Sequence, residues 1–326
     1  MPRIHIIATG GTIAMTHDDR AGGAMPTLSG DYFMQRLLSE AGQELPAVTS
    51  EEYGPLPSAH FTVAHLWGLR ERVALALSQA DVDGVVLTHG TDTLEETAYL
   101  LDLTVPGDKP MVLTGAMRIA SEPGYEGIAN LLAAVRVAVS PAARGLGALV
   151  VLNDEIHAAR DATKTHSQSL DTFKSPFWGP LGRVDSDRIT IARRVERQVI
   201  TCPALEPKVY LLKLALGMDA ELLRQAIKIG ARGIVIESFG GGRVPPWWLN
   251  AIQEAIAQGV TIVIATRCPT GRVYDCYAYV GAYRDLVQAG CLFAEGLSGP
   301  KARLRLMAAL GAARNPSEVR AVFGIP

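Results

Sequence analysis

Short apolar runs that end in a polar turn and are followed by a helical segment recur along the first half of this sequence. The runs occupy residues 6–8, 84–88, 110–114 and 148–152. Strands that alternate with helices in this way form a parallel sheet that is covered by helices on both faces. The pattern therefore predicts an α/β fold built on a mainly parallel sheet.

A second alternating set follows residues 189–207, where prolines interrupt the chain and the pattern breaks down. The expected strands of this set are 208–212, 233–237 and 260–266, and the expected helices are 220–228, 247–257, 300–310 and 317–323. We therefore expect a larger N-terminal α/β domain with a helix-covered sheet, and a smaller C-terminal α/β domain. The expected limits are residues 1–190, a linker over 191–207, and residues 208–326.

Residues 16–30 are polar, rich in glycine and adjacent to the first turn. A loop of about 15 residues is usually either functional or disordered, and its position here favours a lid. Residues 31–41 are expected to be helical, with one side formed by Phe33, Leu37 and Leu38. Residues 51–61 are expected to be irregular because prolines interrupt them.

The turn after the first apolar run reads Thr9-Gly10-Gly11-Thr12. Glycine has no Cβ, so two glycines let the backbone approach a ligand closely and leave N–H groups free to bind an anion or oxyanion. Thr12 then stands on the far side of the turn, where a nucleophile can act. A tight strand–helix turn with a capping threonine explains the same residues without any chemistry.

The turn after the second run reads His89-Gly90-Thr91-Asp92. As structure alone, Asp92 can cap the next helix and Glu95 can close a capping box three residues later. That explanation leaves Gly90 and Thr91 without a role. Ligands bind beyond the carboxyl ends of parallel strands, so both glycine turns are expected on one edge of the sheet, with Arg118 and the loop after Leu152.

A threonine hydroxyl is a poor nucleophile at neutral pH and needs a nearby base. The candidate base is Lys164, in the stretch Arg160-Asp161-Ala162-Thr163-Lys164-Thr165. A lysine beside a buried carboxylate can change its protonation state during proton transfer. The structural alternative is a solvated surface lysine.

Composition excludes several other classes of function. The 326 residues carry a formal net charge of −2 without a basic stripe, which argues against nucleic acid as a partner. No apolar run approaches the ~20 residues of a membrane-spanning helix, and the absence of a signal peptide favours a cytoplasmic protein. The four cysteines form no CxxC pair and the seven histidines are dispersed, so we expect free thiols and no metal site.

These motifs together resemble those of the bacterial-type L-asparaginase and glutaminase-asparaginase family. The matching stretches are residues 8–14, 88–99, 109–118, 153–154, 160–165, 173–175, 179–182, 269–271 and 301–303. The resemblance implies hydrolysis of an amide, L-asparagine to L-aspartate and ammonia, through an ester on a threonine. It implies no cofactor, and it implies a homo-oligomer, a dimer or a tetramer, with sites at the subunit interface.

The resemblance also implies roles for individual residues. Thr12 matches the nucleophile, and Thr91, Asp92 and Lys164 match the set that activates water or the nucleophile. Ser58 matches the serine that binds the substrate α-carboxylate, and Asp92 also matches the group that holds the α-ammonium. The expected substrate-binding residues are Gly11, Ser58, Ala59, Gly90, Thr91 and Asp92.

The departures from the family pattern concern substrate recognition. Pro57 replaces a common aspartate, and Ala59 and His60 replace common polar residues. The lid has no tyrosine near Ala24 or Met25, where the family has one. Two other hypotheses therefore stay open: the same chemistry on a succinamic, N-substituted or cyclic amide, and a ligand-binding module without turnover.

Overall fold

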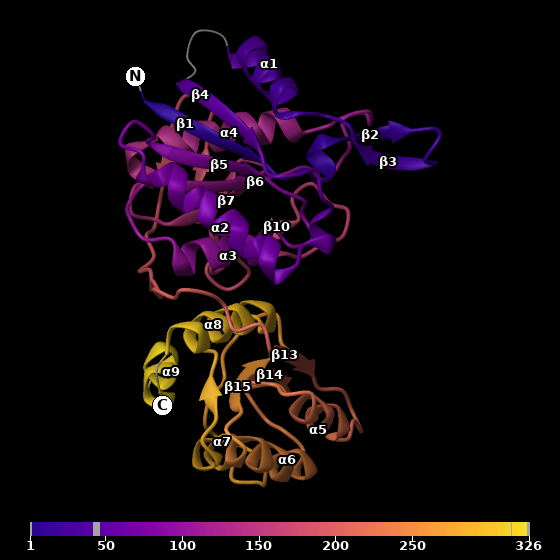
Figure 1. The fold of residues 1–326 in the computed structure, drawn as a ribbon, viewed down its shortest axis with the longest axis vertical. Coiled ribbons are helices and arrows are strands. Elements are labelled where there is room, and N and C mark those ends of the chain that lie inside the picture. The colour runs from indigo at the N-terminus through magenta and orange to yellow at the C-terminus, as the bar shows by residue number, and fades with distance from the viewer. Residues whose placement is uncertain (1, 42–45, 314, 325–326) are drawn as a thin grey trace. The chain divides into compact units, whose positions relative to one another are not determined.

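The computed structural model describes residues 2–41, 46–313 and 315–324. The chain divides after Val199 into two compact units, and each of them is an α/β unit (Figure 1). The predicted fold class is therefore confirmed, with the larger, mainly parallel sheet in the N-terminal unit. The domain limits 1–190 and 208–326, with a linker over 191–207, stay predictions.

The first unit contains an eight-stranded sheet in the order β12-β11-β8-β7-β6-β5-β1-β4. Five of its strands are parallel: β4 (Ala47–Glu52), β1 (Arg3–Ala8), β5 (Gly84–Thr88), β6 (Met111–Thr114) and β7 (Ala148–Leu152). The other three pair antiparallel: β8 (Glu155–Ala158), β11 (Gly182–Val184) and β12 (Ile189–Ile191). The direction changes at Asn153 and Asp154, whose φ angles of 51° and 59° close a tight hairpin.

Helices cover both faces of this sheet. One face packs against α1 (Gly30–Ala41) and α4 (Gly127–Val139). The other packs against α2 (Val63–Ser78) and α3 (Leu94–Thr104). Successive strand residues alternate between the two cores, as Val86 and Leu87 do, because side chains along a strand point to opposite faces.

The crossover through α4 has the opposite hand to its neighbours. The chain moves in one direction across the sheet from β5 to β6 and from β6 to β7, yet α3 and α4 lie on opposite faces. The crossovers through α1, α2 and α3 share one hand. Because parallel crossovers are almost always right-handed, the one through α4 is the left-handed exception. It brings α4 onto the face that α1 covers.

β1 and β5 flank the topological switch point of the sheet. β1 lies between β4 and β5, so the chain leaves β1 toward one edge, whereas it leaves β5 toward the other. A crevice at the carboxyl ends of two such strands is the usual ligand site of an open α/β sheet. The two glycine turns follow these two strands.

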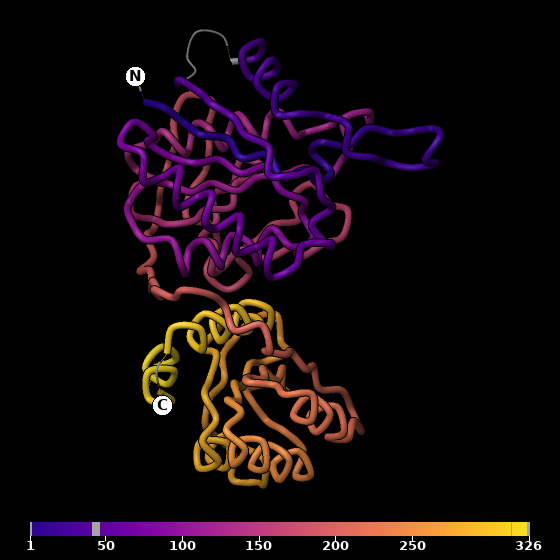
Figure 2. Tube along the Cα trace, viewed as in Figure 1, coloured from indigo at the N-terminus to yellow at the C-terminus, as the bar shows by residue number. Residues whose placement is uncertain are grey.

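Three local expectations are wrong. Residues 16–30 are mostly not a loop: β2 (Met15–Asp18) and β3 (Gly23–Pro26) pair as an antiparallel hairpin that projects from the unit (Figure 2). Their sequence has no period-two alternation because neither face of the hairpin enters the core. Ala47–Glu52 is a strand that runs into the stretch expected to be irregular. Leu38 is 60% exposed, whereas Phe33 and Leu37 are buried.

The second unit contains a four-stranded parallel sheet: β13 (Val209–Lys213), β14 (Gly233–Ser238), β15 (Thr261–Thr266) and β16 (Leu292–Phe293). Its helices are α5 (Glu221–Lys228), α6 (Pro246–Ala257), α7 (Tyr283–Ala289), α8 (Gly299–Ala312) and α9 (Pro316–Phe323). The short elements α7 and β16 are absent from the sequence prediction. Side chains of α5, α6 and α7 share a core with Ile234 and Ile236, and α8 packs against the sheet at Gly233.

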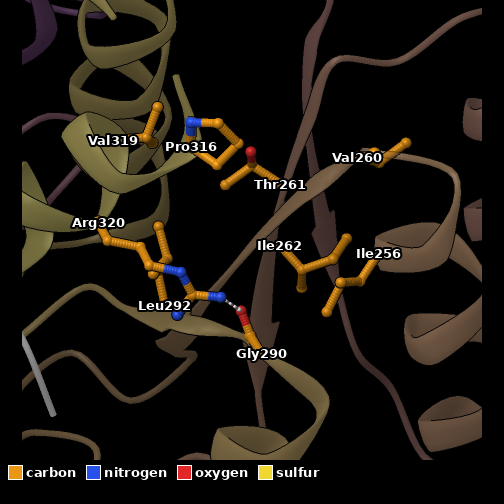
Figure 3. Close-up of a pocket in the computed structure, with 10 residues that line it drawn as sticks. Ile256, Val260, Thr261, Ile262, Gly290, Leu292, Pro316, Val319 and Arg320 are labelled. Atoms are coloured by element: carbon orange, nitrogen blue, oxygen red, sulfur yellow. Dashed lines mark hydrogen bonds between the residues drawn. The ribbon is translucent and has the colours of Figure 1, made fainter.

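A pocket in the second unit is lined mainly by apolar side chains of the stretches 256–262, 290–292 and 316–320 (Figure 3). The one charged side chain in its lining is Arg320, whose guanidinium donates to the Gly290 carbonyl at 3.1 Å. None of the predicted site residues lines this pocket, and its lining offers no carboxylate or lysine for catalysis.

Candidate active site

The two glycine turns are in direct backbone contact. Gly11 has a φ of 82°, and a Cβ built on it would lie 2.4 Å from both the Cα and the N of Gly90. A Cβ on Gly90 would in turn lie 2.6 Å from the Oγ of Ser58. Three chain segments thus meet at distances that only glycine permits, which explains the residue type in both turns.

Thr12 is the first residue of a 3₁₀ turn, η1 (Thr12–Ala14), directly after two glycines with positive φ. The threonine is half-buried, and the next two residues are buried in the core. Within the described ranges no hydrogen bond engages its hydroxyl. Thr12 therefore lies just beyond β1, with its backbone fixed in the η1 turn and its hydroxyl not engaged in a hydrogen bond among the described residues.

Lys164 joins the second turn through its side chain. It lies in the short strand β9 (Thr163–Lys164), and its Nζ donates to Thr91 Oγ1 at 2.9 Å and to Asp92 Oδ1 at 2.8 Å. The Lys164 side chain is 17% exposed, so the alternative of a solvated surface lysine is wrong. The expectation of a buried carboxylate beside it is also wrong, because the Asp92 side chain is 66% exposed.

The capping box expected at Asp92 and Glu95 is not formed. The N-cap of α3 is Thr93, and no side chain caps the helix there. Glu95 Oε2 instead accepts a hydrogen bond from the backbone N of Lys164 at 2.6 Å. The sequence predicts that the Glu95 carboxylate caps its own helix, but it instead holds the backbone of Lys164, 69 residues away in sequence.

Ser58 is 4% exposed and begins the 3₁₀ turn η3 (Ser58–His60) against Gly90. Its carbonyl accepts a hydrogen bond from Thr93 Oγ1 at 3.0 Å, so the start of α3 also holds this segment. Ala59, the neighbouring predicted binding residue, is exposed. The structure thus brings Ser58 to the two turns and leaves Ala59 at the surface.

His89 is fully buried behind the second turn. Its Nδ1 lies 2.8 Å from the Gly90 carbonyl and its Nε2 lies 3.0 Å from Thr97 Oγ1. A carbonyl only accepts, so Nδ1 carries the hydrogen and Nε2 accepts from the threonine hydroxyl. Burial lowers the pKa of His89 to about 4, which keeps the ring neutral. The sequence marks this histidine as part of a motif but gives no sign of its supporting role.

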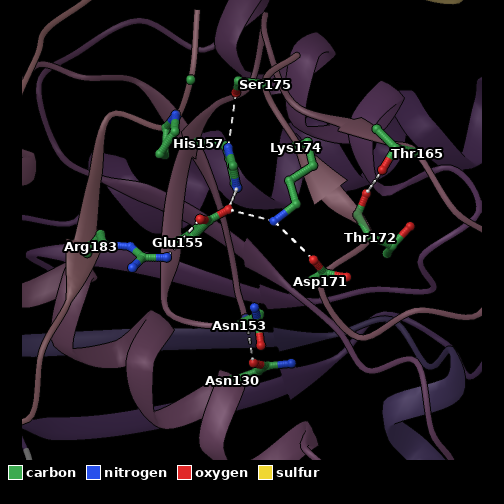
Figure 4. Close-up of polar contacts among 12 residues, drawn as sticks. Asn130, Asn153, Glu155, His157, Thr165, Asp171, Thr172, Lys174, Ser175 and Arg183 are labelled. Atoms are coloured by element: carbon green, nitrogen blue, oxygen red, sulfur yellow. Dashed lines mark hydrogen bonds and ion pairs between the residues drawn. The ribbon is translucent and has the colours of Figure 1, made fainter.

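An ion network lies beside the strand that carries Lys164 (Figure 4). Glu155 accepts from Lys174 Nζ at 3.2 Å and from Arg183 Nη2 at 2.8 Å. Lys174 belongs to β10 (Phe173–Lys174), which pairs antiparallel with β9. The network therefore ties β10, and with it the ladder that holds Lys164, to the start of β8.

Asn130 joins the ends of two central strands. Its Nδ2 donates to the Gly115 carbonyl at 3.0 Å. Its Oδ1 accepts from the Asn153 N at 3.0 Å (Figure 4). Arg118, expected on the same edge, is exposed and donates to the Gly124 carbonyl at 3.0 Å. Across the described residues no group of three or more histidine, cysteine, aspartate or glutamate side chains is placed to hold a metal ion.

Comparison with known proteins covers both units. Residues 3–197 match the family described as "Asparaginase, N-terminal", and residues 208–323 match the "Glutaminase/Asparaginase C-terminal domain". A protein named L-asparaginase from Bacillus licheniformis is 35% identical over 305 residues, covering 93% of this chain and 94% of its own. L-asparaginase 2 of Bacillus subtilis is 36% identical over 99% of this chain and 86% of its own.

A further relative bears on location. It is named "Probable L-asparaginase periplasmic", comes from Haemophilus influenzae, and is 33% identical over 99% of this chain and 93% of its own. In the described part of this chain no helix has both the length and the apolar character needed to cross a bilayer. The cytoplasmic location stays a prediction.

Proposed function

This chain belongs to the glutaminase/asparaginase family, whose members are hydrolases of linear amides, and from that premise we propose that it converts L-asparagine to L-aspartate and ammonia. The observation that carries the proposal is the 2.9 Å hydrogen bond from Lys164 Nζ to the Thr91 hydroxyl, next to the turn of Thr12. A protein that only binds an amide has no need of a proton acceptor at this place.

In the proposed first step the Thr12 hydroxyl attacks the carbonyl carbon of the side-chain amide. The bond from Oγ1 to carbon forms, the carbon–nitrogen bond breaks, and the hydroxyl proton leaves with the nitrogen as ammonia. The negative charge that develops on the carbonyl oxygen is stabilised by backbone N–H groups near Gly11 and Thr91. The product of this step is an ester on Thr12.

In the second step water attacks that ester. The hydroxide part of the water joins the acyl carbon, and the remaining proton returns to Thr12 Oγ1, which regenerates the enzyme. Lys164 accepts and returns protons through the Thr91 hydroxyl during both steps. Glu95 holds the lysine backbone in place at 2.6 Å, and the Asp92 carboxylate, 2.8 Å from Nζ, orients the lysine side chain.

Substrate binding uses groups around the two turns. The Ser58 hydroxyl binds the α-carboxylate, and Asp92 binds the α-ammonium with the oxygen that Lys164 leaves unoccupied. Gly11 and Gly90 bring the two turns and Ser58 together around the substrate, because any side chain there would clash with Gly90 and Ser58 respectively. Ala59 borders the site at its exposed rim.

A different amide is the second candidate substrate. Pro57 and Ala59 flank Ser58 without a hydrogen-bonding side chain, and the one carboxylate in the predicted binding set, Asp92, is largely exposed. A charged ammonium that lacks buried partners is bound less well, by about 1–3 kcal/mol for each missing partner. A succinamic or cyclic amide, or an N-substituted amide without a free amine, carries no such charge and avoids this loss.

The experiment compares ammonia release from L-asparagine, glutamine, succinamate and cyclic ureides by the wild type and by Thr12→Ala. We expect the wild type to act on at least one of them, and the variant to lose at least about 1,000-fold in kcat while still binding substrate. Thr16→Ala, a hydroxyl change in β2, is the matched control. A wild type that is inert on every amide contradicts the proposal and supports a binding module.

We also propose that the enzyme is a homo-oligomer, a dimer or a tetramer, with sites at the subunit interface and no cofactor. Light scattering across the concentration range of the activity assay tests the assembly. If specific activity falls when dilution dissociates the oligomer into monomers, the proposal is supported. A fully active monomer contradicts it.

A further inference from the structure

The three residues after Thr12 each have a backbone carbonyl that another segment binds. The Ile13 carbonyl accepts from the Tyr125 hydroxyl at 2.7 Å. The Ala14 carbonyl accepts from the N–H groups of Thr27 and Leu28, at 3.0 Å each. The Met15 carbonyl accepts from the N–H of Ala120 at 2.8 Å. Tyr125 is the one donor of this set that acts through its side chain. Its contact also spans the longest stretch of sequence, 112 residues.

The left-handed crossover accounts for how Tyr125 reaches this place. Because α4 lies on the face that α1 covers, the segment before α4 packs against the core that also contains Ile13. The tyrosine ring lies directly over Gly127, where a Cβ would stand 2.2 Å from the phenol oxygen. Burial raises the pKa of Tyr125 above its ordinary value, so the phenol keeps its proton and donates.

We propose that Tyr125 is a positioning residue for catalysis: through the Ile13 carbonyl it holds the η1 turn so that the Thr12 hydroxyl faces the second glycine turn. The hairpin β2–β3 has no tyrosine at Ala24 or Met25, and Tyr125 orients the nucleophile from the segment before α4 instead. The inference rests on the proposed role of Thr12 as the nucleophile.

The test is Tyr125→Phe, which removes only the hydroxyl. One lost hydrogen bond at the nucleophile turn corresponds to about a tenfold fall in kcat, and KM stays within about twofold because the substrate contacts are untouched. Tyr32→Phe is the matched control: this half-buried tyrosine packs against the same core, and no hydrogen bond of its hydroxyl occurs within the described ranges. We expect its kcat to be unchanged.

Gly127→Ala provides an independent second variant. Alanine suits a helix, Gly127 opens α4 without a positive φ, and the three atoms nearest the added methyl all belong to the Tyr125 side chain. We expect the displaced ring to lose the Ile13 contact and kcat to fall as in Tyr125→Phe. Combining the two substitutions adds little further loss, because both remove the same hydrogen bond.

A purely structural role predicts a different result: the urea midpoint falls in Tyr125→Phe while the kcat of the folded enzyme stays within twofold of wild type. That result overturns the inference. This outcome differs from failure of the proposed function, because in that case Thr12→Ala would keep the turnover of the wild type. A selective loss of kcat in Tyr125→Phe and Gly127→Ala, in an enzyme that depends on Thr12, supports the inference.

Discussion

The two glycine turns, to which we assign complementary tasks, are held in different ways. The second turn is held by buried and half-buried side chains close to it in space: His89 by Thr97, and Thr91 by Lys164. The segment that follows the first turn is held through its backbone carbonyls, by the Tyr125 hydroxyl and by backbone N–H groups of two other segments. Side-chain contacts fix the proposed proton-transfer group, whereas backbone contacts leave the hydroxyl of the proposed nucleophile free. The variants below test this contrast.

The largest expected effect is on the second turn, from Lys164→Met. The substitution keeps the length of the side chain but removes the amine that contacts Thr91 and Asp92. Because positioned acid–base groups contribute about 10²–10⁴-fold, we expect kcat to fall by about 1,000-fold in steady-state assays.

The control for this variant is Lys174→Met, which removes an amine from the paired strand β10. Lys174 contacts Glu155 but neither threonine, and a part-exposed ion pair is worth at most about 1 kcal/mol, or about fivefold. Equal losses in the two lysine variants would contradict the assigned role of Lys164.

The contact between the turns is the second target. Gly90→Ala places a methyl group 2.6 Å from Ser58 Oγ and 3.1 Å from the Ser58 N, so this segment must shift. We expect KM to rise at least tenfold and the free energy of unfolding to fall by about 1–3 kcal/mol, since overpacking strains the backbone.

Gly23→Ala is the matched control, because nothing lies within 4 Å of its added methyl group and its φ is not positive. We expect wild-type kinetics and stability. If Gly90→Ala is equally neutral, the close approach of the two turns is not needed for substrate binding.

The smallest effect concerns pH and stability. Burial lowers the pKa values of His89 and His157 to about 4, against an ordinary value of about 6.5 in the unfolded chain. Between pH 6.5 and 4 the unfolded chain therefore binds more protons, and the free energy of unfolding falls as pH falls. The loss is at most about 3 kcal/mol for each histidine, and it levels off below pH 4.

Urea unfolding from pH 7 to pH 4.5 measures this dependence. We expect His157→Asn to be less stable at pH 7 but to show a shallower pH dependence, since one of the two histidines no longer titrates. His17→Asn changes an exposed histidine in β2 and should keep the wild-type slope. If the free energy of unfolding of His157→Asn depends on pH as steeply as that of the wild type, the lowered pKa of His157 is contradicted.

The sequence predicts the sheet and both turns because their signals are local. Apolar runs of strand length and the glycines at their ends depend on near neighbours, and Gly11 and Gly90 prove to be in contact. Lys164 is also predicted, first as the candidate base and then through the resemblance to the family. The positive φ angles at Asn153 and Asp154, which reverse the chain after β7, are typical of those residue types and could have been predicted.

The features that the sequence analysis did not predict are mainly contacts between segments far apart in the sequence. Glu95 has two possible partners, its own helix end and the distant Lys164 backbone, and only the folded chain decides between them. Tyr125 reaches Ile13 because α4 crosses with the uncommon hand, which no local pattern encodes. The hairpin β2–β3 is formed by pairing between two four-residue segments, without the alternation that marks a strand at a core.

The most direct test of the central claim is to trap the ester on Thr12. The enzyme is quenched in acid during turnover of an ester that carries the same acyl group and a good leaving group, and its peptides are then analysed by mass spectrometry. The account predicts one acyl group on the peptide that contains Thr12, and none in Thr12→Ala. An acyl group on the peptide that contains Thr91, or an unmodified protein during steady turnover, would contradict it.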